Sequence, residues 1–173
     1  MATLAACQPP APEPTPVPSP TPVATPAPTP APVATASPVF DNWMDAPQTP
    51  GDWRYVAEPT ETLAVFGTGR TPDTVELIIR CDLSTRRVGI ARSGSANGQV
   101  EMLVRTETQD RTLTATPMGG VAPLITVQLS ANDNLLDAIA FSKGRFAVVT
   151  PGTNALYAPA YPEITRVMED CRD

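Results

Sequence analysis

The stretch 75-VELIIRC-81 alternates between apolar and polar residues in the manner of a β-strand, and it sets the pattern for much of the chain. One face of this strand carries four apolar side chains, those of Val75, Leu77, Ile79 and Cys81. The other face carries Glu76 and Arg80, together with the apolar Ile78. The presence of Ile78 on that face indicates a strand that is covered on both sides.

Six further segments show the same period of two and are separated by short turns. They are residues 62–66, 87–92, 100–105, 111–116, 124–129 and 145–150. Because consecutive strands joined by short turns usually pair with each other, these segments predict an antiparallel meander of about six or seven strands.

Two segments change to helical spacing. In the first, Leu135, Leu136, Ile139 and Ala140 recur at helical intervals, Asn132 or Asp133 can cap the start, and Gly144 can close the end. The second begins at Pro162, which a first helical turn tolerates, and carries an apolar stripe of Ile164, Val167, Met168 and Cys171. The sequence therefore predicts an α+β fold: a mostly antiparallel sheet with two helices, of which the C-terminal one packs on the sheet.

The N-terminal tetrapeptide Leu4-Ala5-Ala6-Cys7 resembles the lipobox of bacterial lipoproteins. The resemblance implies that Cys7 carries a lipid, becomes the first residue after cleavage, and holds the protein on a membrane. A secretion signal needs a charged region and an apolar run before this box, and only residues 1–3 precede it. We therefore interpret residues 1–7 as the remnant of a signal whose upstream part is missing. The alternative is an ordinary cysteine in a disordered tail.

Residues 8–38 form a Pro/Ala/Thr-rich tract, because 13 of the chain's 22 prolines lie between Pro9 and Pro38. Such a tract favours polyproline II, at about 3.1 Å per residue, and predicts a disordered, semi-rigid stalk of at most about 100 Å. Gln8, directly after the cysteine, resembles the outer-membrane default of enteric lipoproteins. We thus expect a single globular domain at residues 39–173, lipid-anchored at the bacterial outer membrane or in the periplasm.

Two cysteines remain in the predicted domain, Cys81 and Cys171, and both fall on faces predicted to point inward. In an oxidising compartment two spare thiols usually pair. The disulfide would close a loop of roughly 90 residues and contribute about 4–5 kcal/mol in the chain-entropy model. The alternative is two free cysteines that pack as small hydrophobic residues.

Composition excludes several classes of function. The net charge is −6 and no Lys/Arg-rich run occurs, which argues against nucleic-acid binding. The chain has no histidine, so a Ser-His-Asp or Cys-His site cannot form within it. With two distant cysteines in the domain and no Gly-rich phosphate loop, we expect no metal site, no cofactor and no catalytic residue.

Arginines provide the candidate binding residues. Six of them lie on or beside predicted strands: Arg80, Arg86, Arg87, Arg92, Arg105 and Arg111. If they share a solvent face, their guanidinium groups can bind phosphates of lipid A or carboxylates of peptidoglycan. We single out Arg86, Arg87 and Arg92 as the anion- or glycan-binding set. The alternative is ordinary surface charge that keeps strand edges from aggregating.

The last third of the chain, through residues 140–149 and 162–172, resembles uncharacterised envelope proteins of alphaproteobacteria. The resemblance implies no activity and adds no catalytic residue. We therefore expect a non-catalytic envelope lipoprotein, a binding or structural module whose partner is an envelope protein or peptidoglycan. The alternative is a hydrolase of envelope glycans that uses only carboxylates, for which Glu101, Glu107 and Asp110 are the candidates. A third option is a structural protein without a ligand.

Overall fold

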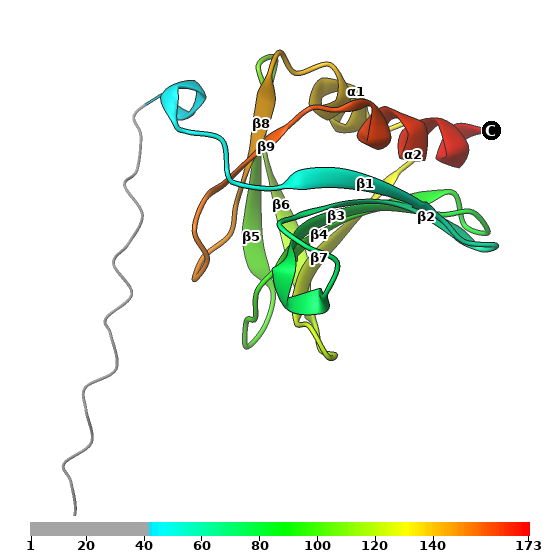
Figure 1. Cartoon of the computed structure of the whole chain (residues 1–173), viewed down its shortest axis with the longest axis horizontal. Helices are drawn as coiled ribbons and strands as arrows, with labels where there is room; N and C mark the ends of the chain where they lie inside the picture. The colour runs from blue at the N-terminus through cyan, green and yellow to red at the C-terminus, as the bar shows by residue number, and fades with distance from the viewer. Residues whose placement is uncertain (1–41) are drawn as a thin grey trace, which may run out of the picture. The chain divides into compact units, whose positions relative to one another are not determined.

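Residues 42–173 are the part of the chain that the computed structural model describes, and they form an α+β fold built on a nine-stranded antiparallel sheet (Figure 1). The predicted fold class is thereby confirmed. The strands are β1 (Asp52–Ala57), β2 (Glu61–Gly67), β3 (Val75–Asp82), β4 (Arg87–Ser93), β5 (Val100–Arg105), β6 (Asp110–Met118), β7 (Leu124–Ser130), β8 (Arg145–Val149) and β9 (Leu156–Pro159). The helices are α1 (Asn134–Ala140) and α2 (Pro162–Arg172), with 3-10 turns η1 (Trp43–Asp45) and η2 (Pro72–Thr74). The predicted lipid site at Cys7 and the predicted stalk lie outside the described residues.

The strand order is β1-β2-β3-β4-β7-β6-β5-β8-β9. Neighbours in sequence pair from β1 to β4 and from β5 to β7, as a meander requires. The prediction of one continuous meander is wrong, however, because β4 pairs with β7 instead of β5. This is the arrangement of a Greek key. It places β7, and not the next strand β5, beside β4 in the middle of the sheet.

The sheet turns sharply at β6. This strand pairs with β5 over residues 110–115 but with β7 only over residues 116–118. Figure 1 shows the result: β5, β6 and β8 stand steeply against the β1–β4 part of the sheet. One face of the bent sheet holds α2, and we call it the inner face; the opposite one is the outer face.

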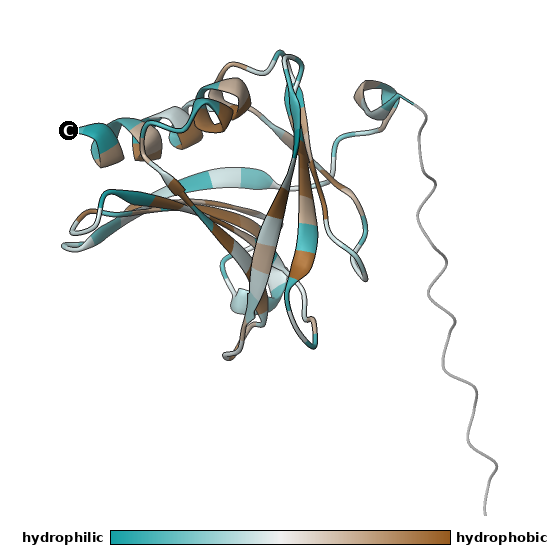
Figure 2. Cartoon of the chain, turned by 180° about the vertical axis from the view of Figure 1, so that it is seen from behind, coloured by the Kyte–Doolittle hydropathy of each residue, from teal (hydrophilic) through white to brown (hydrophobic). Residues whose placement is uncertain are grey.

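Helix α2 lies on the inner face of β1–β4 and closes the core there. Its stripe of Ile164, Val167, Met168 and Cys171 is buried, as the spacing predicted. Facing it are Phe66 from β2 and Leu77 and Ile79 from β3, all fully buried. The apolar side of the helix and the apolar bands along the strands are visible in Figure 2.

A disulfide joins Cys81 of β3 to Cys171 in the last turn of α2, with 5.5 Å between their Cα atoms. Both residues are buried in the core. This is the pairing expected from the sequence, and it fastens the C-terminal helix covalently to the middle of the sheet.

Helix α1 begins and ends by different means. The Asp133 carboxylate accepts a hydrogen bond from the Leu135 N–H and caps the start, as predicted. The helix ends at Ala140 with Phe141 as its C-cap, before the predicted Gly144. Gly144, at φ +81°, instead occupies the left-handed position in the turn that leads into β8, where a side chain would strain the backbone.

The two edge strands, β1 and β9, meet through side chains. The indole N–H of Trp53 in β1 donates to the carbonyl of Pro159 in β9 at 2.8 Å. The Trp53 ring also lies 5.2 Å from the Phe66 ring and 6.4 Å from the Phe146 ring, measured between centroids. The curved sheet thus nearly closes on itself, with these rings filling the junction.

The free edge of β9 is covered by the segment that precedes β1. The Thr49 N–H donates to the Tyr157 carbonyl at 2.9 Å, and the Tyr157 N–H donates to the Thr49 hydroxyl at 2.9 Å. Just before this contact, the Arg145 side chain donates to the Ala46 carbonyl. Unpaired strand edges invite pairing with other chains, and this segment removes one such edge.

Candidate functional site

The structure does not bring Arg86, Arg87 and Arg92 together. Arg86 follows β3 in a tight turn at φ +54°, and its guanidinium donates to the Asp170 carbonyl of α2 at 3.4 Å. It therefore points toward the inner face. Arg87 is the first residue of β4, is exposed, and lies on the outer face. Arg92 lies near the opposite end of the same strand.

Arg92 is a structural residue. Its side chain is only 7% exposed and donates to the Glu76 carboxylate at 2.6 Å. Further hydrogen bonds go to the carbonyls of Glu76, Ser93 and Asn154. Because its guanidinium is buried and bonded in this way, Arg92 is not presented to a ligand from solvent.

Arg87 lines a hollow on the outer face of β2, β3, β4, β7 and β6, which we call the outer groove. Its volume is about 570 Å³. Small-molecule sites typically enclose about 300–1,000 Å³. Since side chains alternate along a strand, the groove is formed by residues between those of the core, such as Ile78 between Leu77 and Ile79.

Two small residues of β4, Gly89 and Ala91, leave the middle of the outer groove empty. The sheet register places Gly89 between Arg80 of β3 and Gln128 of β7. A Cβ added at Gly89 would meet nothing nearer than two carbonyl oxygens at 3.9 Å, which is ordinary contact. The hollow therefore exists because side chains are missing there, and a larger residue at Gly89 would fill it.

Charged groups gather at one end of the outer groove. Arg80 contacts the Glu61 carboxylate at 2.6 Å and the Asp82 carboxylate at 3.7 Å. Arg87 stands opposite Asp82 in the register, yet among residues 42–173 it forms no ion pair and makes one long hydrogen bond, to the Gln128 carbonyl at 3.4 Å. Of the two arginines at this end of the outer groove, Arg87 is thus the one whose guanidinium remains available to a ligand.

The Asp82 carboxylate is held in its ionised form by the β3–β4 turn. The Ser84 hydroxyl donates to it at 2.7 Å, and the N–H groups of Ser84 and Thr85 donate at 3.0 Å each. These hydrogen bonds, with the Ser84 hydroxyl contributing most, lower the pKa of Asp82 to about 2.

We expect Asp82→Asn to lower the free energy of unfolding at pH 7, with a difference that disappears in acid. The folded-state pKa of Asp82 lies below its ordinary value of 3.8, so its contribution is complete above pH 3.8 and is lost as the pH falls through about 2. Urea denaturation between pH 7 and pH 2 measures both proteins. A difference that stays constant down to pH 2 would contradict the turn's role.

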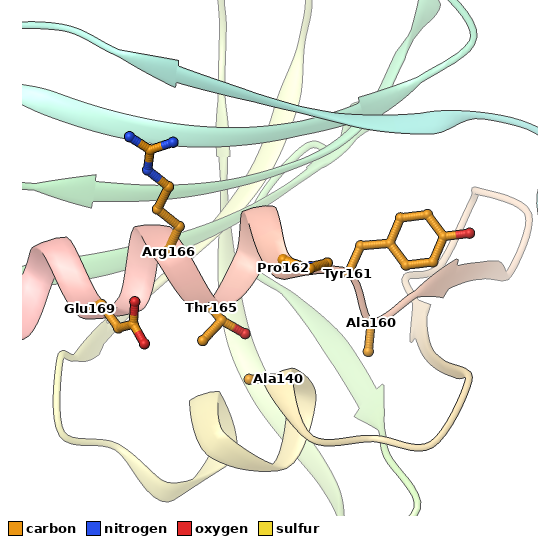
Figure 3. A pocket seen from close by; sticks show the side chains of 7 residues that line it. All are labelled: Ala140, Ala160, Tyr161, Pro162, Thr165, Arg166 and Glu169. Carbon is orange, nitrogen blue, oxygen red and sulfur yellow. The ribbon is translucent and has the colours of Figure 1, made fainter.

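A second, shallower hollow lies between α1 and the start of α2 (Figure 3). Figure 3 shows Arg166 turned toward the strands and Tyr161 turned away from the hollow. The Arg166 guanidinium lies 3.9 Å from the centre of the Tyr55 ring, in a cation–π contact. The Tyr55 hydroxyl donates to Asp170 at 2.7 Å, and partial burial together with this bond raises the pKa of Tyr55. The guanidinium of Arg166, one of the two charged groups that line this hollow, is therefore engaged within the fold.

The three carboxylates considered for hydrolysis lie outside the outer groove. Asp110 pairs with Arg105 at 2.9 Å, and Glu107 contacts Lys143 at 3.4 Å. Glu101 is exposed on β5. Within residues 42–173 no three metal-ligating side chains come together, and neither helix is long and apolar enough to cross a bilayer.

Comparison of the chain with protein-family models, with curated proteins and with solved structures finds no match. The function is therefore inferred from the residues themselves.

Proposed function

We propose that this protein is a non-catalytic binding module of the bacterial cell envelope, anchored by a lipid on Cys7 and held off the membrane by the Pro-rich stalk. One observation carries the binding role: the outer groove combines an aliphatic floor with an arginine, Arg87, that has no carboxylate partner in the described chain. The disulfide Cys81–Cys171 supports an oxidising location such as the periplasm, although only weakly by itself.

The geometry gives the carboxylate hydrolase less support. A general acid must hold its proton near neutral pH, which requires a raised pKa. The groove's own carboxylates, Glu61 and Asp82, both contact Arg80, and the pKa of Asp82 is lowered to about 2. Asp82 therefore has the lowered pKa of a group that remains charged, which is the opposite of what a general acid requires.

The anchoring half of the proposal is tested by replacing Cys7. In the cells that make this protein, we expect it in the membrane fraction, with an intact mass that lacks the first six residues and includes acyl chains. The Cys7→Ser variant should appear in the soluble envelope fraction at its unmodified mass. Treating the purified protein with a reductant should break the Cys81–Cys171 bond and raise the mass by two hydrogens, one on each sulfur.

A wild-type protein with Met1 in place, an unmodified Cys7 and no mass change on reduction would rule out the anchor and the envelope location together.

A further inference from the structure

We infer that the outer groove binds a single aliphatic chain that ends in an anionic group, with the anion at Arg87 and the chain running along β4 toward Met118. This inference rests on the proposed binding role and adds the class of ligand. A fatty carboxylate and a single-chain lipid phosphate share this chemistry.

The polarity of the groove changes in steps along β4. Four rows of outward side chains cross the sheet, as the register shows. The first row contains Asp82 and Arg87, and the second contains Arg80, Gly89 and Gln128. The third contains Ile78, Ala91 and Thr126, and the fourth contains Leu124 and Met118. The first row is ionic and the second is mixed. Thr116 also belongs to the third row and Ser93 to the fourth, so these two rows combine aliphatic side chains with hydroxyl groups. At about 3.3 Å per residue, the four steps along the strand from Arg87 to Ala91 span about 13 Å. The groove is therefore an elongated amphipathic track.

Arg87 is the group best placed to hold an anionic head. The neighbouring Arg80 is already engaged by Glu61 and Asp82, whereas Arg87 makes only a 3.4 Å bond to a carbonyl. A guanidinium presents several N–H donors in one plane and binds carboxylates and phosphates through paired hydrogen bonds. A head group at this point leaves its chain facing the open space above Gly89.

The aliphatic end is accessible and adaptable. Met118 is 52% exposed and lies next to Leu124 in the register. Methionine adjusts its shape to the apolar group that it contacts. Burial of a ligand chain against Met118, Leu124 and Ile78 would stabilise the complex in proportion to the apolar area covered.

Two other ligand classes fit the outer groove less well. No Trp, Tyr or Phe lines it, so a sugar ring or a base would find no aromatic ring on which to stack. An extended peptide binds a sheet through backbone hydrogen bonds at a free edge. The groove's central strands, β3, β4 and β7, are paired on both sides. An aliphatic chain needs neither an aromatic ring nor a free strand edge.

The test titrates the full chain, carrying Cys7→Ser so that no acyl group of its own competes, with dodecanoate and with dodecyl phosphate by isothermal titration calorimetry. We expect saturable binding at one site for at least one of them, and no binding of dodecyltrimethylammonium, which has the same chain and the opposite charge. Tighter binding of dodecanoate indicates a free fatty acid as the natural ligand, and tighter binding of dodecyl phosphate indicates a phosphate-headed lipid.

Two variants locate the site. Arg87→Gln should weaken binding about 10- to 100-fold, the loss expected for one charged hydrogen-bonding partner. Gly89→Val should abolish binding by filling the hollow, while the fold remains intact because the added Cβ has room. Their matched controls are Arg86→Gln, the adjacent arginine that points to α2, and Gly98→Val, a glycine with no atom within 4 Å of an added Cβ. Both controls should bind as the parent does.

Equal binding of the anionic and cationic chains, or unchanged affinity in both Arg87→Gln and Gly89→Val, would overturn the inference. If Gly89→Val does not fold, as judged by near-UV circular dichroism, Ala91→Leu takes its place. Membrane attachment of the wild-type protein is measured separately, so a failure of dodecanoate and dodecyl phosphate to bind rejects the ligand class without rejecting the anchor.

Discussion

Replacing both Cys81 and Cys171 by alanine should lower the free energy of unfolding by about 4–5 kcal/mol. The bond spans 90 residues, and its loss releases the unfolded chain from this long loop and raises its conformational entropy. The two sulfurs also connect α2 to β3 within the core, so their removal leaves small cavities that add to the cost. Guanidinium denaturation at neutral pH gives the value directly.

The third cysteine provides the matched control. Cys7→Ser leaves the Cys81–Cys171 bond in place, and we expect its unfolding midpoint to equal that of the wild type. Addition of dithiothreitol should shift the wild type and the Cys7→Ser variant toward the midpoint of the double alanine variant. If reduction leaves the midpoint unchanged, the disulfide is not a main source of stability.

The second large effect is expected at Trp53. Trp53→Ala removes the ring that lies against Phe66 and Phe146 and joins the two edges of the sheet, and it should cost about 3–5 kcal/mol. The unfolding free energy from urea titration measures this loss. A cost below about 1 kcal/mol would mean that the junction of β1 and β9 contributes little to the fold.

Trp53→Phe separates the ring from its hydrogen bond. Phenylalanine keeps much of the packing but leaves the Pro159 carbonyl without the indole donor at 2.8 Å, so we expect a smaller loss of about 1–3 kcal/mol. Trp43→Phe is the control, because Trp43 makes no side-chain hydrogen bond to any residue from 42 to 173. It should be closer to neutral.

The strands that contain long alternating runs were predictable because one face of each must be apolar to fill the core. Strands β1 and β9 escaped prediction for physical reasons. Only Trp53 of β1 is fully buried, and β9 has just four residues and ends in proline. A single buried residue in β1 and a length of four residues in β9 are too little for an alternating pattern to stand out.

Strand partners were less predictable than strands. The alternation of β4 is compatible with any antiparallel neighbour, and nothing in its pattern distinguishes β5 from β7. The choice is made by contacts between residues that are far apart in the sequence, such as Val88 with Leu129. Periodicity describes each strand separately and therefore does not predict which strands pair.

In the candidate site, too, the residues could be identified from the sequence, but their arrangement could not. The arginines of β4 were visible in the sequence, but consecutive positions of a strand point to opposite faces, and the tight turn at Arg86 separates it further from Arg87. Gly89 and Ala91 carry the clearest signal that was overlooked. Two small residues on the outward face of a central strand mark a hollow, although the rows that surround them become known only with the register.

The Cys81–Cys171 bond also determines how the protein would respond to a pulling force applied between its two ends. Tension that enters through the N-terminal segment bypasses everything between the two sulfurs, because the bond carries the load across a Cα–Cα distance of 5.5 Å. Without the bond, the same 90 residues could stretch to about 300 Å. Strands β4 to β9 and helix α1 all lie inside this loop. Stretching can therefore unravel β1, β2 and β3 as far as Cys81, while β4, β6 and β7, three of the five strands that form the outer groove, are shielded from extension.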